Sequence, residues 1–87
     1  MDLIEKFKDW NLKRSYSNLG VALANIVADP ISKDRDPFFY FMIEKMSEDY
    51  QKIEAKYLEA GYAPVNFLEE RIKKGKPISR KSVGRLN

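Results

Sequence analysis

The residues of this 87-residue chain that are best suited to chemistry are gathered at its carboxyl end. The last 17 residues contain seven lysines and arginines and no aspartate or glutamate. The first 70 contain nine basic and 13 acidic side chains, a net charge of −4, so the +3 of the whole chain hides a strongly basic end. Concentrated positive charge with apolar residues between the cations is typical of a surface that binds a polyanion, most often nucleic acid. The seven cations are Arg71, Lys73, Lys74, Lys76, Arg80, Lys81 and Arg85.

The sequence offers no set of residues for catalysis or for holding a metal ion. It has no histidine, which removes the usual general base at neutral pH and the commonest metal ligand. It has no cysteine, which excludes a disulfide scaffold and thiolate metal sites. The serines therefore lack the relay that nucleophilic catalysis requires. We expect a protein that is not an enzyme and that uses no metal ion or other cofactor.

The basic end also carries a local pattern over residues 78–86, which reads Ile-Ser-Arg-Lys-Ser-Val-Gly-Arg-Leu. On a helix, its apolar residues share one side and its cations share the other. This pattern resembles the turn and recognition helix of helix-turn-helix proteins. In that family the first residues of the helix contact base edges and phosphates in the major groove of DNA. The resemblance implies nucleic-acid contacts from Ser79, Arg80, Lys81, Ser82 and Arg85.

Hydrophobic spacing predicts an all-α fold, a small bundle of four main helices plus a short basic C-terminal helix. Apolar residues recur every three or four positions, and no segment alternates as a strand does. Gly61 and Gly75 are suited to the left-handed conformation that ends a helix, and Pro37 is suited to a first helical position. The main helices are expected at about residues 2–13, 16–28, 37–60 and 64–74. The first two can also run together, since nothing between them strictly breaks a helix.

The apolar residues also predict which helix is central. The helix at 16–28 is apolar nearly all round, which is typical of a helix in the middle of a fold. Within it, Gly20 and Ala24 allow a neighbour to approach closely. In the helix at 64–74 we expect Val65, Phe67, Leu68 and Ile72 to face inward.

Two aromatic residues, Tyr40 and Phe41, lie off the main apolar stripe of the helix at 37–60. Exposed aromatic side chains can anchor a partner or stack on bases, which makes these two the candidate partner-binding residues. In the alternative interpretation the first helix covers them, because its Phe7 and Trp10 need apolar neighbours.

These features predict a helical body, residues 1–75, and a basic C-terminal segment, residues 76–87. We expect a non-catalytic nucleic-acid-binding protein whose basic end contacts phosphates, on DNA rather than RNA. The alternative is a small phage- or plasmid-type inhibitor or adaptor, for example an anti-defence protein, that binds a nucleic-acid-handling protein. The candidate nucleic-acid-binding residues are Arg71, Lys73, Lys74, Lys76, Ser79, Arg80, Lys81, Ser82 and Arg85.

The hydropathy of the chain bears on its location and assembly. No apolar run approaches the roughly 20 residues that span a bilayer, and the first residues lack the pattern of a signal peptide. We therefore expect a cytoplasmic protein without membrane contact. A homodimer is a further prediction, because a domain of this size has little core of its own and can complete it by self-association.

Overall fold

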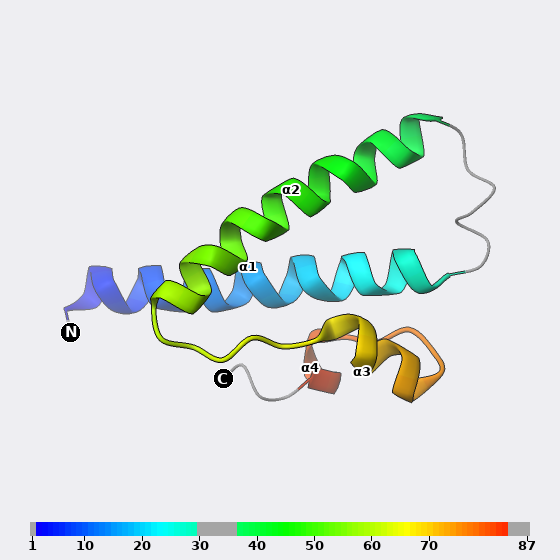
Figure 1. The fold of residues 1–87 in the computed structure, drawn as a ribbon. Coiled ribbons are helices and arrows are strands. Elements are labelled where there is room, and N and C mark those ends of the chain that lie inside the picture. The colour runs from blue at the N-terminus through cyan, green and yellow to red at the C-terminus, as the bar shows by residue number, and fades with distance from the viewer. Residues whose placement is uncertain (1, 30–36, 84–87) are drawn as a thin grey trace.

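The computed structural model of the chain describes residues 2–29 and 37–83, the last two of them by their backbone alone. Within these ranges every regular element is a helix, and there are four: α1 (Leu3–Ala28), α2 (Pro37–Glu59), α3 (Phe67–Lys74) and α4 (Arg80–Val83). α1 and α2 form an open V that is closed near the end of α2, and α3 and α4 lie on the other side of α1 (Figure 1). The predicted all-α class is confirmed, with three main helices instead of four.

The two helices predicted at residues 2–13 and 16–28 are one continuous helix, α1. Ser17, just after the predicted break, lies inside this helix, where its Oγ donates to the carbonyl oxygen of Arg14 at 3.1 Å, as a serine inside a helix often does. The cap lies at the start instead, where the Asp2 carboxylate accepts the N–H of Glu5 at 2.8 Å. The helix continues through the predicted break because Tyr16, which lies there, is completely buried in the core.

Tyr16 is the centre of that core. Its ring stacks on the ring of Tyr57 with centroids 4.0 Å apart and meets the edge of the Phe67 ring at 5.2 Å. Its hydroxyl oxygen accepts the backbone N–H of Val65 at 3.0 Å. One side chain of α1 therefore contacts α2, α3 and the segment between them. The buried apolar residues are Tyr16, Val21, Ala24, Tyr57, Phe67 and Ile78.

The central position predicted for the second half of α1 is confirmed, since α1 packs against α2, α3 and α4. Gly20 is the point of closest approach. A Cβ atom at this position would overlap the ring of Phe67, so glycine is what lets α3 begin directly against α1. Ala24 is buried one turn further on.

α2 matches the helix predicted at 37–60 to within one residue. After it, the chain turns at Gly61, whose φ of +96° is in the left-handed region, as predicted. The Tyr62 hydroxyl then donates to the Asp9 carboxylate, which also pairs with Lys13 at 3.2 Å. The Tyr62 hydrogen bond is the main cause that lowers the pKa of Asp9. These contacts hold the segment after α2 on the first half of α1.

α3 begins at Phe67, later than the predicted start at Pro64. Asn66 caps the helix by accepting the N–H of Glu69 at 3.0 Å. Val65 lies in the irregular segment before the helix, where its N–H donates to the hydroxyl oxygen of the core tyrosine.

The way α3 packs against α1 overturns part of the predicted core. Leu68 and Ile72 are 41% and 65% exposed, although the spacing predicted that they face inward. Phe67 alone fills the space above Gly20. The helix ends at Gly75 in the left-handed conformation, as predicted.

Candidate nucleic-acid interface

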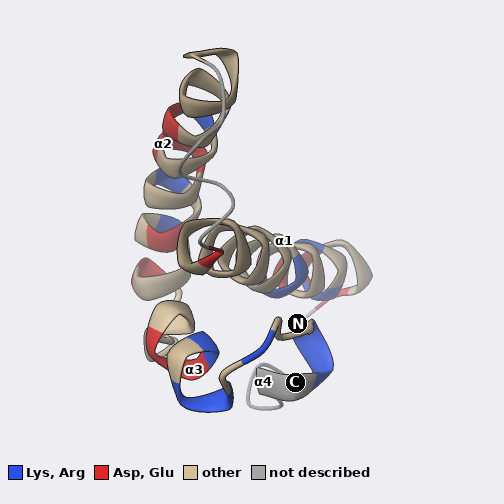
Figure 2. Ribbon diagram, turned by 90° about the vertical axis from the view of Figure 1, so that its right-hand side faces the viewer, with Lys and Arg blue, Asp and Glu red and all other residues tan. Residues whose placement is uncertain are grey.

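The predicted basic residues that the structure describes lie on α3, on the turn after it and on α4. Figure 2 shows these elements on the side of α1 away from the free end of α2. Five of the predicted cations have exposed side chains and are called the basic surface below: Lys73, Lys74, Lys76, Arg80 and Lys81. α3 itself is polarised, with Glu69 and Glu70 in its first turn and its cations in the last turn, an order that complements the helix dipole.

Most of this charge is available to a ligand. Lys73 pairs with Glu69 at 3.0 Å, but both side chains are exposed, and such a pair is worth at most about 1 kcal/mol. Among the described residues, no carboxylate lies within 4.0 Å of Lys76, Arg80 or Lys81. These three side chains are therefore not neutralised by the acidic residues of the described body.

Arg71 does not share this exposure. Its side chain is half-buried, and its Nε is shielded from solvent without a hydrogen-bond partner among the described residues. Its guanidinium is therefore only partly accessible to a phosphate, whereas the side chains of the basic surface are exposed. The sequence grouped Arg71 with the other cations because all lie within the last 17 residues, whereas burial separates it from them.

The turn between α3 and α4 is fixed to α1 by one side chain, Asn25. Its Nδ2 donates to the carbonyl oxygen of Ile78 at 2.8 Å, and its Oδ1 accepts the N–H of the same residue at 2.9 Å. The Ile78 side chain is 5% exposed. The backbone N–H and carbonyl of Ile78 are both hydrogen-bonded, and its side chain is buried. The backbone of the turn that carries the cations therefore has a defined position.

Sequence reasoning did not identify Asn25 as important to the site. The available signal was an amide in the apolar half of α1, where a buried polar group needs a partner. The partner is 53 residues away, and no spacing rule identifies it.

The remaining predicted contacts are distributed as follows. Ser79 is exposed and immediately precedes α4. Ser82 lies within α4, which is a single turn. Arg85 lies outside the described residues, as does the end of the segment that resembles a recognition helix.

Tyr40 and Phe41 lie far from the basic surface, at the free end of α2 (Figure 1). They are 49% and 65% exposed. The interpretation that Phe7 and Trp10 cover them is wrong, and the continuity of α1 is the reason. One straight helix carries Phe7 and Trp10 to the closed end of the V, where both are more than half exposed.

Across the described ranges, no group of three or more acidic residues is placed to hold a metal ion. None of the helices described there combines the length and the apolar character needed to cross a bilayer. Comparison of the chain with family models, with curated proteins and with solved structures found no match.

Proposed function

We propose that this protein is a non-catalytic nucleic-acid-binding protein that places its basic surface on phosphate groups. The observation that carries the proposal is the exposure of Lys76, Arg80 and Lys81 without a nearby carboxylate among the described residues. The two hydrogen bonds between Asn25 and Ile78 also support the proposal, because cations on a fixed backbone lose less conformational entropy when they bind. Duplex DNA is the expected form, on the resemblance of residues 78–86 to a recognition helix.

Phosphate contact dominates the energy of such an interface. The lysines act as point charges, whereas Arg80 can form two parallel hydrogen bonds with one phosphate. Neutralising phosphates releases condensed counterions, so affinity falls as salt rises. Five cations imply a slope of about −4 to −5 for log affinity against log salt.

A salt-titrated binding measurement tests this function. Fluorescently labelled duplex DNA, single-stranded DNA and duplex RNA are titrated with the protein at several salt concentrations. We expect the affinity for duplex DNA to fall by about two to three orders of magnitude between about 50 and 200 mM salt. Absence of binding to all three ligands at the lowest salt would remove the proposal.

A second candidate function is that of an inhibitor or adaptor that binds another protein. A different surface favours it, the amino-terminal apolar face of α1 (Leu3, Ile4, Phe7 and Trp10). All four side chains are more than half exposed, and Arg14 lies over the Trp10 ring at 5.2 Å. Exposed tryptophan, phenylalanine and arginine are the residues that anchor protein interfaces. This face therefore supports the alternative function, a small inhibitor or adaptor that binds another protein, and we propose a nucleic-acid-handling enzyme as that partner. A purified candidate enzyme should bind the wild-type chain after nuclease treatment and lose at least about 10-fold in affinity for a Phe7→Glu, Trp10→Glu variant.

A further inference from the structure

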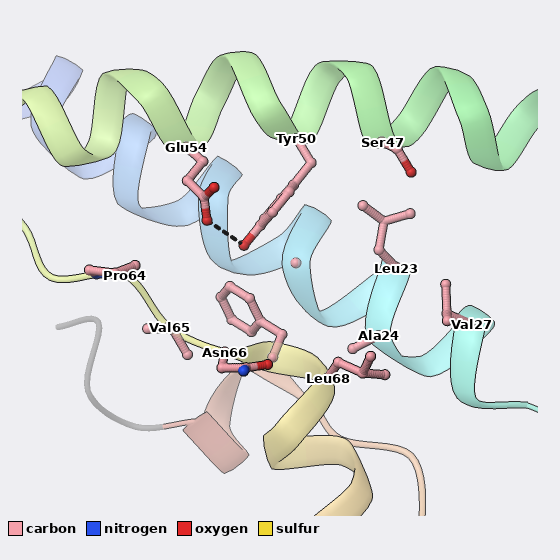
Figure 3. A pocket seen from close by; sticks show the side chains of 12 residues that line it. Leu23, Ala24, Val27, Ser47, Tyr50, Glu54, Pro64, Val65, Asn66 and Leu68 are labelled. Carbon is pink, nitrogen blue, oxygen red and sulfur yellow. Dashed lines mark hydrogen bonds between the residues drawn. The ribbon is translucent and has the colours of Figure 1, made fainter.

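A pocket of about 510 Å³ lies where α1 and α2 diverge, between these two helices and residues 64–68 (Figure 3). The helical residues that line it recur about every three or four positions, so one face of each helix forms a wall. The volume is within the range of pockets that bind small molecules. The wall residues include Leu23, Ala24 and Val27 of α1 and Ser47, Tyr50 and Glu54 of α2.

The two ends of the pocket differ in chemistry. Glu54 lies at one end, and the side chain of Val27 lies at the other (Figure 3). Near Val27 the lining is hydrocarbon, from Leu23 and Leu68 as well. Val27 is 51% exposed and Leu68 41%, so water lies on apolar surface that the body of a ligand would cover instead. Ser47 and Glu54 are seven residues apart, which makes the α2 wall about 10 Å long, close to the length of a small amphiphilic molecule.

Among the described lining residues, Glu54 alone is charged. The Tyr50 and Tyr16 hydroxyls lie 3.1 and 3.4 Å from its Oε2 atom. Burial is the main cause that raises the pKa of Tyr50, which keeps this hydroxyl a donor at neutral pH. Within the described part of the chain, Oε1 has no hydrogen-bond partner, and no lysine or arginine nitrogen lies within 4.0 Å of the carboxylate. Neutral donors therefore orient the carboxylate and leave its charge without a cation.

This charge decides which class of ligand the pocket suits. An uncharged apolar molecule would take water from the Glu54 carboxylate without replacing its hydrogen bonds, which is unfavourable. An anionic molecule would be repelled by the same group. A protonated amine supplies both a donor and the opposite charge, and charge-assisted hydrogen bonds of this kind are among the strongest in proteins. The polar end of the pocket therefore complements an ammonium group, and the apolar end complements a hydrocarbon body.

We propose that this pocket binds a small molecule with an apolar body and one protonated amine. The amine pairs with the Glu54 carboxylate, and the body covers Val27 and Leu68 at the opposite end. The site shares no residue with the basic surface, so ligand binding here is a property additional to the proposed contact with nucleic acid.

Three probes that share one body and differ in their head group test the proposal on the full wild-type chain. They are phenylbutylamine, phenylbutanol and phenylbutyrate, and binding is followed by the amide shifts of the lining residues in nuclear magnetic resonance. We expect the amine to bind with a dissociation constant of about 0.1–1 mM, as suits a ligand of this size. The alcohol should bind at least about 10-fold more weakly, because it lacks the charge. The carboxylate should not bind.

Variants at the two ends of the pocket separate the two contacts. Glu54→Gln should weaken amine binding about 10-fold and leave alcohol binding unchanged. Val27→Asn should weaken both by about threefold, because it acts on the apolar body. Glu59→Gln is the matched control, since it removes the same charge from an exposed residue of α2 that does not line the pocket.

The comparison of the three probes on the wild-type chain does not depend on the folding of any variant. Equal affinities for the amine and the alcohol would overturn the proposal, as would unchanged amine binding by Glu54→Gln. Absence of amine binding up to about 10 mM would also overturn it. Because no nucleic acid is present, none of these results bears on the basic surface.

Discussion

Replacing Tyr16 with alanine should lower the free energy of unfolding by about 3–5 kcal/mol, the usual cost of truncating a large buried aromatic side chain. The Tyr16 ring is completely buried and stacks 4.0 Å from the Tyr57 ring. A chain of this length has a total stability of only about 4–13 kcal/mol. The Tyr16→Ala variant should therefore lose a large fraction of its stability, measured as a lower midpoint in urea denaturation followed by circular dichroism.

Two further variants separate the causes of that loss. Tyr16→Phe keeps the stacking but removes the acceptor of the Val65 N–H, and should cost about 1–3 kcal/mol. Phe7→Ala is the matched truncation at an exposed site of the same helix, and should cost less than about 1 kcal/mol. Equal costs for Tyr16→Ala and Phe7→Ala would mean that Tyr16 is not the centre of the core.

Replacing Lys76, Arg80 and Lys81 together with glutamine is expected to weaken duplex DNA binding about 100- to 1000-fold at about 50 mM salt. Three fewer phosphate contacts should also make the salt slope shallower by about 2 to 3. The measurement is the same fluorescence titration at several salt concentrations. The charge control replaces Lys6, Lys52 and Lys56, which are exposed on α1 and α2, and it changes the net charge equally. If both triple variants lose the same affinity, the location of the charge is irrelevant and the proposed interface is wrong.

Asn25→Ala affects the same surface without removing a charge. Both Ile78 backbone groups lose their partner, so we expect a loss of about 1–3 kcal/mol in stability and faster hydrogen exchange at the Ile78 amide. DNA affinity should fall while the salt slope stays near its wild-type value, because the number of cations is unchanged. Asn18→Ala, at an exposed position of α1, is the control. An unchanged affinity would show that the fixed position of the turn does not contribute to binding.

The helical segments were predictable because their signals are local. The apolar stripe of α2, Pro37 at its start and Gly61 after its end act within a few residues of where they lie. Gly75 gave the end of α3 in the same way. The start of α3 was missed because Pro64 is a local signal for a helix start, whereas the helix begins only after Asn66 caps it and after Val65 has bonded to Tyr16, 49 residues away.

The sequence by itself determined the all-α class, the approximate helices and the concentration of positive charge at the carboxyl end, since composition and short-range periodicity fix these. Only the tertiary structure decided that α1 is continuous, that Leu68, Ile72, Phe7 and Trp10 are exposed, and that Asn25 holds Ile78. Each of these outcomes depends on how distant segments pack. Periodicity gives the face on which a residue lies, but not whether another element covers that face.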